Sequence, residues 1–70
     1  MNAPSAPELL GDDDMTVLRL LAKGSTGRGV ARELGIAPAT AQRRIRRLRT
    51  TFGVATTIEA VAAAARSRLV

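Results

Sequence analysis

Residues 38–52 read Pro-Ala-Thr-Ala-Gln-Arg-Arg-Ile-Arg-Arg-Leu-Arg-Thr-Thr-Phe, and the apolar positions in this stretch repeat with the period of a helix. Ala41, Ile45, Leu48 and Phe52 follow one another at intervals of four, three and four residues. This spacing puts them on one stripe of a helix with about 3.6 residues per turn. The stretch therefore predicts a helix that packs along one side.

The side opposite this stripe is basic. It carries Arg43, Arg46 and Thr50, given a rotation of about 100° per residue. The flanks hold Gln42, Arg47 and Arg49. Arg44 lies nearer the packed edge, where we expect part of its role to be structural. The helix thus combines five arginines with no acidic residue.

Two simpler explanations do not account for this basic face. A face that only meets solvent usually mixes acidic and basic residues, and this face does not. The excess of ten arginines over one lysine is typical of GC-rich coding, but such bias does not explain why acidic residues are absent here and gathered elsewhere. The pattern favours contact with an anionic partner, and nucleic acid is the leading candidate.

The charge is distributed unevenly along the chain. Residues 1–22 carry four acidic side chains against one arginine, whereas residues 23–70 carry ten basic side chains against two acidic ones. The net charge of +5 therefore understates the positive charge of the larger part. Such a part can attract a polyanion at long range.

The composition limits what this chain can do. Seventy residues with one aromatic residue form one small domain, which buries only about 60% of its unfolded surface. Without cysteine or histidine the chain has neither the usual zinc ligands nor an imidazole for acid–base catalysis. We expect no enzymatic activity, metal, cofactor or small-molecule ligand.

The first residues predict a flexible lead-in. Residues 1–9 hold two prolines and a polar mixture, so we expect a linker there and a domain over residues 10–70. The N-terminus lacks the basic start and apolar stretch of a signal peptide, and no apolar run is long enough to span a membrane. The expected location is the cytoplasm, which the absence of cysteine also fits.

A first helix is expected to begin at Asp12, Asp13 and Asp14, because acidic residues suit the positive end of a helix and aspartate can cap it. These acids do not resemble a calcium loop, which needs a glycine turn and a later glutamate. The apolar positions between Met15 and Ala22 continue the helix, and Gly24 is suited to end it.

A helix-turn-helix follows. Ser25-Thr26-Gly27 predicts the start of a short helix over about 28–34, with Val30, Ala31 and Leu34 facing inward. Gly35 ends it, and Pro38 opens the basic helix about three residues later. Two helices joined by so short a turn form this motif.

A fourth helix is predicted after Gly53. Thr56 followed three residues later by Glu59 has the pattern of a capping box. The alanine-rich body of this helix, residues 60–65, allows close approach of another helix. That neighbour is either the domain's own core or a second subunit, and the sequence leaves both open.

Laid out in this way, the chain resembles the LuxR/FixJ-type (GerE-like) DNA-binding domain of bacterial transcription regulators. The resemblance covers roughly residues 10–70 and rests on six short stretches in the expected order. They are Val17-Leu18-x-Leu-Leu-Ala22-x-Gly24, Val30-Ala31-x-x-Leu34-Gly35-Ile36, Thr40, Phe52-Gly53-Val54, Glu59-Ala60-Val61 and Arg68-Leu69-Val70.

The resemblance implies an all-α domain of four helices, with helices two and three as the helix-turn-helix and double-stranded DNA as the partner. Helix three would enter the major groove, and helix four commonly forms a dimer interface in the family. We expect that candidate homodimer interface at Val61, Ala62 and Ala65.

The resemblance also suggests roles for individual residues. Thr40 falls where the family has a threonine that contacts phosphate. The positions that usually read bases hold Gln42, Arg43 and Arg46. Arg47 and Arg49 are placed for phosphate contacts by position alone. Arginine can bind guanine and glutamine can bind adenine through two hydrogen bonds each, so the residue types fit.

The chain departs from the family at three positions. Ala37 replaces the Ser or Thr that usually caps helix three, Gln42 replaces a common lysine, and Gly29 replaces an acidic residue of helix two. Family members usually carry a receiver or ligand-sensing domain as well. We therefore expect either an excised domain or a stand-alone regulator.

The sequence is also compatible with a second class of function. A helix-turn-helix can serve as a protein-interaction module, with its arginine face on an acidic partner. The promoter-binding domain of a sigma factor has a similar motif, but the residues from Gly53 to Val61 argue against it.

Overall fold

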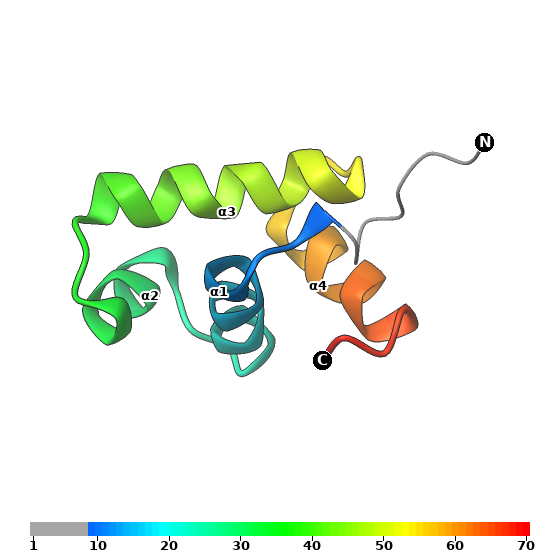
Figure 1. Cartoon of the computed structure of the whole chain (residues 1–70), viewed down its shortest axis with the longest axis horizontal. Coiled ribbons are helices and arrows are strands. Elements are labelled where there is room, and N and C mark those ends of the chain that lie inside the picture. The colour runs from blue at the N-terminus through cyan, green and yellow to red at the C-terminus, as the bar shows by residue number, and fades with distance from the viewer. Residues whose placement is uncertain (1–8) are drawn as a thin grey trace.

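The computed structural model describes residues 9–70, which form four helices and no strand. In chain order these are α1 (Asp12–Ala22), α2 (Gly27–Leu34), α3 (Pro38–Phe52) and α4 (Thr57–Arg66). Figure 1 shows α3, the longest helix, lying across the other three. The prediction of an all-α, four-helix domain is confirmed. Of the predicted lead-in, residues 1–8 lie outside the described part, and Leu9 is exposed.

Local signals set most of the helix ends. The Thr26 hydroxyl accepts the Gly29 N–H at 3.1 Å and caps α2, which begins one residue before the predicted start. The Thr56 hydroxyl caps α4 by accepting the Glu59 N–H at 3.1 Å. Ala37 provides no side-chain cap for α3, as its methyl group dictates, and Pro38 follows it directly.

Left-handed glycines end both helices of the helix-turn-helix. Gly35 has φ of 65° and Gly53 has φ of 68°. These values lie in the left-handed backbone region, which residues with a side chain rarely adopt. Each turn is completed by a backbone bond, from Ile36 N–H to the Ala31 carbonyl at 3.0 Å and from Val54 N–H to the Arg49 carbonyl at 2.9 Å. Three residues therefore separate α2 from α3, as the sequence predicted.

The start of α1 differs from the simplest expectation. The N-cap is Gly11, which has no side chain, and the aspartates occupy the first turn. The Asp14 carboxylate reaches back and accepts the Gly11 N–H at 3.2 Å. The capping acid thus acts from the third helical residue and not from the cap position itself.

The core forms where α3 meets the other helices. Ala41, Ile45 and Leu48 are buried, and Phe52 is half-buried against the same cluster, so the predicted stripe is confirmed. The other helices contribute Val17, Leu18, Val30, Ala31, Ala60 and Ala64. α3 contacts α1, α2 and α4. On α4 only alanines are fully buried, which lets that helix approach α3 closely.

We expect Leu18→Ala to unfold much of this domain. Leu18 is 0% exposed, and replacing a buried leucine by alanine costs about 2–5 kcal/mol. A core of this size rarely supplies more than about 3–5 kcal/mol in total. Leu9→Ala is the matched control, because Leu9 is 55% exposed and should lose less than about 0.5 kcal/mol. Urea unfolding followed by circular dichroism measures both, and equal losses would contradict this assignment of the core.

Candidate nucleic-acid interface

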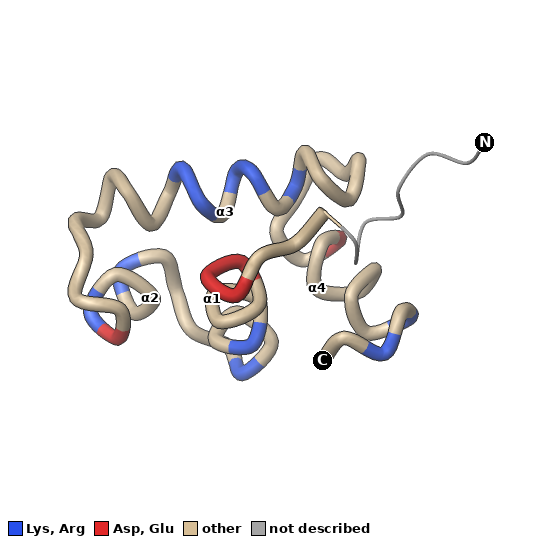
Figure 2. The backbone as a smooth tube through the Cα atoms, in the orientation of Figure 1, with Lys and Arg blue, Asp and Glu red and all other residues tan. Residues whose placement is uncertain are grey.

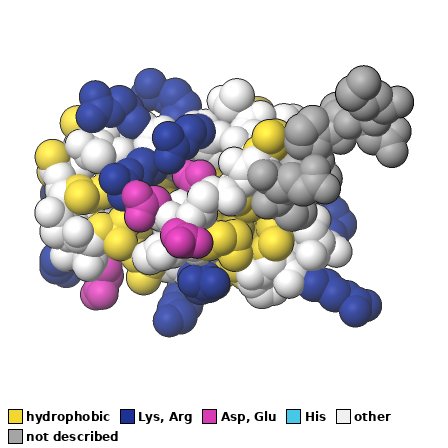
Figure 3. Space-filling model, in the orientation of Figure 1, with side chains coloured by type: hydrophobic (Ala, Val, Ile, Leu, Met, Phe, Trp, Pro, Cys, Tyr) yellow, Lys and Arg dark blue, Asp and Glu magenta, His cyan; other side chains and the backbone are white. Residues whose placement is uncertain are grey.

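The outer side of α3 presents a shallow basic depression. It has a volume of about 310 Å³ and is lined by Arg43, Arg46, Arg47 and Thr50, all of them exposed. These positions recur at intervals of three, one and three residues, which places them on one helical face opposite the buried stripe. Figure 2 shows the cationic positions along α3, and Figure 3 shows their side chains gathered on the surface over this helix.

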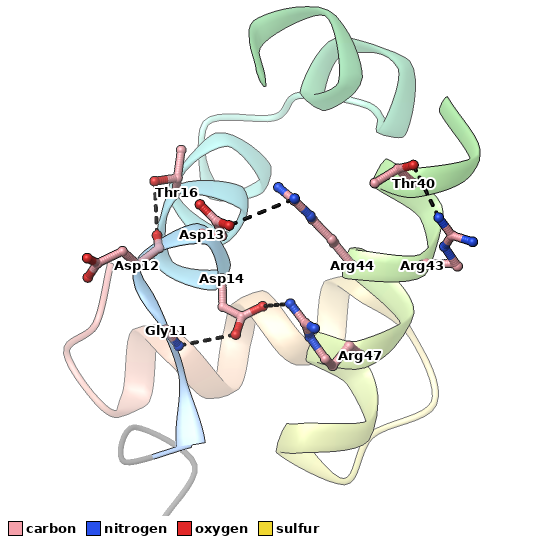
Figure 4. Close-up of polar contacts among 9 residues, drawn as sticks. All are labelled: Gly11, Asp12, Asp13, Asp14, Thr16, Thr40, Arg43, Arg44 and Arg47. Carbon is pink, nitrogen blue, oxygen red and sulfur yellow. Dashed lines mark hydrogen bonds and ion pairs between the residues drawn. The ribbon is translucent and has the colours of Figure 1, made fainter. Parts of the chain in front are cut away.

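At the start of α3, two of the predicted site residues are linked. Arg43 Nη2 donates a hydrogen bond of 3.3 Å to the Thr40 hydroxyl, and Thr40 is half-buried in the first turn. The contact holds the guanidinium of Arg43 toward the N-terminal end of the outer face (Figure 4). Thr40, predicted to contact phosphate, and Arg43, predicted to read a base, are therefore neighbours on α3.

Gln42 is exposed but lies against α2. A Cβ atom added at Gly27 would come within 2.5 Å of Gln42 Nε2, so the amide occupies space that the missing side chain of Gly27 leaves open. The Gln42 amide therefore lies toward α2, although its position four residues before Arg46 makes the two neighbours along α3. Its contact with Gly27 was not predicted, because it depends on how α2 and α3 cross.

Two arginines of α3 are paired with the acids at the start of α1. Arg47 Nη2 lies 2.9 Å from Asp14 Oδ1, and Arg44 Nη2 lies 3.8 Å from Asp13 Oδ2. Figure 4 shows both guanidinium groups directed at α1. The partial burial of Arg44 agrees with its expected place near the packed edge. The partner of Arg47 was missed, since the two residues are 33 positions apart in the chain.

Asp14 is the one buried polar residue in the part of the chain that the structure describes. Its side chain is 11% exposed, whereas that of Arg47 is 60% exposed. The carboxylate accepts one bond from Arg47 and another from Gly11, which satisfies both oxygens. The same group thus caps α1 and joins α1 to α3.

Arg49 lies on the other edge of α3. It is half-buried, like Arg44, and about 100° per residue places these two on opposite sides of the packed stripe. The five arginines therefore differ in setting. Arg43 and Arg46 face outward, Arg47 faces outward while paired, and Arg44 and Arg49 lie at the edges.

A second surface lies beside α4. Val61, Ala62 and Ala65, predicted as a dimer interface, line an apolar groove of about 430 Å³. The other lining residues are Leu21, Gly24, Ser25, Thr57 and Ile58. Ile58 is 82% exposed, although it is a large apolar side chain. The sequence did not single out Ile58, because its place outside the core is set by the packing of α4 on Ala60 and Ala64.

Neither a cluster of metal ligands nor a membrane span is found among residues 9–70. No three Asp or Glu side chains among them are placed to share a metal ion. None of the four helices has the length and apolar character needed to cross a membrane.

The family model of bacterial regulatory proteins of the luxR family matches residues 8–64. The chain belongs to this family. The match spans the helix-turn-helix and most of α4, which confirms the resemblance, although it ends before the last predicted stretch at residues 68–70. No curated protein and no solved structure matches the chain significantly. The luxR-family domain is a DNA-binding domain of transcription regulators, and the family is not one of enzymes.

We expect Asp14→Ala to lower the free energy of unfolding by about 1 kcal/mol, since it removes the side-chain acceptor at the start of α1. Asp12→Ala is the matched control: it deletes the same charge from the same helical turn, but the structure gives the Asp12 carboxylate no partner within residues 9–70. Its loss should stay within about 0.5 kcal/mol. Thermal unfolding checks both. Equal losses would mean that charge at the helix end alone accounts for the effect.

Proposed function

We propose that this domain binds duplex DNA sequence-specifically, with α3 as the recognition helix in the major groove. The observation that carries the proposal is the exposed basic depression on the second helix of a helix-turn-helix. An α-helix with its side chains is about 10–12 Å across, and the major groove is about 12 Å wide. The buried stripe of α3 leaves the opposite face clear to enter such a groove.

Base reading is proposed for Gln42, Arg43 and Arg46. Exposure of all three supports this, and the bond between Arg43 and Thr40 limits the directions that the guanidinium can take. Each arginine offers paired N–H donors to guanine O6 and N7. Gln42 has to turn away from Gly27 before its amide can meet a base.

Phosphate contacts are proposed for Thr40, Arg47 and Arg49. These would fix the position of α3 along the duplex without carrying sequence information themselves. Arg47 is 60% exposed and retains donors beyond the one that meets Asp14. Arg49 lies half-buried at the edge of the helix, and from there its side chain would reach a DNA backbone strand that flanks the groove.

The apolar groove beside α4 is proposed as the contact between two copies of the domain. An 82% exposed isoleucine next to Val61, Ala62 and Ala65 gives an apolar patch that a second copy would cover. Such a dimer would bind two half-sites separated by about one turn of DNA.

A selection from a random duplex pool at physiological salt tests the function, because this salt suppresses binding driven by phosphates alone. We expect an enriched motif, with two-fold symmetry if the domain dimerises. Absence of any enriched motif would refute sequence-specific binding, and capture of an acidic protein instead would favour the protein-interaction alternative.

With an enriched site in hand, Arg43→Ala should cost about 1–3 kcal/mol in binding and relax the preference at one base pair. Arg49→Ala should weaken all duplexes alike and reduce the salt dependence, with a slope lower by about 1. Fluorescence anisotropy on the selected duplex and its single-base variants separates these outcomes. If the two variants behave identically, the division into reading and anchoring residues is wrong.

Ile58→Ser tests the proposed dimer. Since Ile58 is 82% exposed, the monomer should fold as before. We expect weaker binding to a duplex with two half-sites and unchanged binding to a single half-site. If the variant binds each of the two duplexes as tightly as the unaltered chain does, this groove is not the contact between the two copies.

A further inference from the structure

We propose that Asp13 and Asp14 are specificity-determining residues, which act by tethering Arg44 and Arg47 of the recognition helix. The tethers weaken binding to arbitrary duplex more than binding to the cognate site. The inference rests on the proposed function and adds two acidic residues of α1 to a surface that sequence patterns assign to α3 alone.

The tether on Arg47 is built to persist when DNA approaches. Asp14 is buried, and apart from Arg47 its only partner in residues 9–70 is the Gly11 N–H. If Arg47 left for a phosphate, a buried carboxylate would lose its counter-charge, which is strongly unfavourable. Arg47 is nevertheless 60% exposed, so its remaining N–H groups can donate to a phosphate while the pair stays intact.

The contact of Arg44 is looser, and its carboxylate partner is exposed to solvent. Its distance to Asp13 is 3.8 Å, and the Asp13 side chain is 75% exposed. A pair of this kind adds little stability. The carboxylate nevertheless lies beside the basic face, well within the screening length of about 8 Å at physiological salt, and repels a phosphate that comes near it.

Tethering makes the phosphate contacts of these arginines depend on the position of α3 along the duplex. An arginine with a free, flexible side chain can follow phosphates wherever the helix happens to lie. An arginine held by a carboxylate offers donors in one direction, so it helps only when base contacts by Arg43 and Arg46 have fixed the register. Neither of these two has an acidic partner in the described part of the chain.

Counterion release gives the size of the effect. Binding without sequence preference depends on salt with a slope of about −0.9 for each phosphate neutralised. If all five arginines of α3 were free to neutralise phosphates, they would contribute a slope of about −4.5. With Arg44 and Arg47 tethered, the remaining three would contribute about −2.7 on an arbitrary duplex. At 0.15 M salt, each released arginine should tighten binding to arbitrary duplex by roughly fivefold.

Asp13→Asn and Asp14→Asn test the proposal, with Asp12→Asn as the matched control. All three remove one negative charge from the same turn, and Figure 4 shows Asp12 pointing away from α3. Asp14→Asn keeps a side-chain oxygen that can accept the Gly11 N–H. Circular dichroism checks that each variant folds. Affinity for the selected duplex and for a scrambled one is measured from 50 to 200 mM salt.

We expect Asp14→Asn to bind the scrambled duplex roughly fivefold more tightly at 0.15 M salt, with a slope steeper by about 0.9, and to gain little on the selected duplex. Asp13→Asn should change in the same direction. Asp14→Glu, which keeps the charge, should keep the ratio of the two affinities close to that of the unaltered chain.

Two results would overturn the inference while the proposed function stands. The first is that Asp13→Asn and Asp14→Asn change the affinity for either duplex no more than Asp12→Asn does. The second is that they tighten binding to the selected and the scrambled duplex equally. If the unaltered chain does not prefer the selected duplex to the scrambled one, the proposed function itself fails and the inference fails with it.

Discussion

Burial of Ala41, Ile45 and Leu48 is the constraint on which the rest of the structure depends. These three side chains hold α3 against α1, α2 and α4 at once, in a chain with a single aromatic residue and no disulfide. Because the buried side chains of α3 lie along one stripe, the outward side carries no core residue and contributes to helix packing through the Arg47–Asp14 pair. A long helix fixed along one side and open along the other is what insertion into a groove requires.

The second constraint is electrostatic. Crowding five arginines onto one short helix creates mutual repulsion that acidic side chains on the same helix would relieve, but those would also repel DNA. Here the compensation comes from α1, where Asp14 caps its own helix and pairs with Arg47. The domain thus relieves its charge at one edge and leaves Arg43 and Arg46 uncompensated on the outer face. Fold stability and the chemistry of the proposed interface are linked through this one carboxylate.

The sequence was sufficient to predict the helices and insufficient to predict their contacts. Thr26, Gly35, Pro38 and Gly53 act on backbone groups within a few residues, so the ends of α2 and α3 follow from local chemistry. The bond between Asp14 and Arg47, the position of Gln42 against Gly27 and the exposure of Ile58 depend on how whole helices cross. Spacing along the chain carries no such information. The acids of α1 were correctly predicted to start a helix, but their partners lie more than thirty residues away.

The most direct measurement of the central claim is an NMR titration of the isotope-labelled 70-residue chain with a selected duplex that carries a single half-site. The account predicts the largest shift changes on the outer face of α3, at Arg43, Arg46, Arg47 and Thr50. Residues of the groove beside α4, such as Leu21 and Ile58, should change little, because one half-site recruits no second copy. Changes concentrated in that groove, with the outer face of α3 unaffected, would contradict the account.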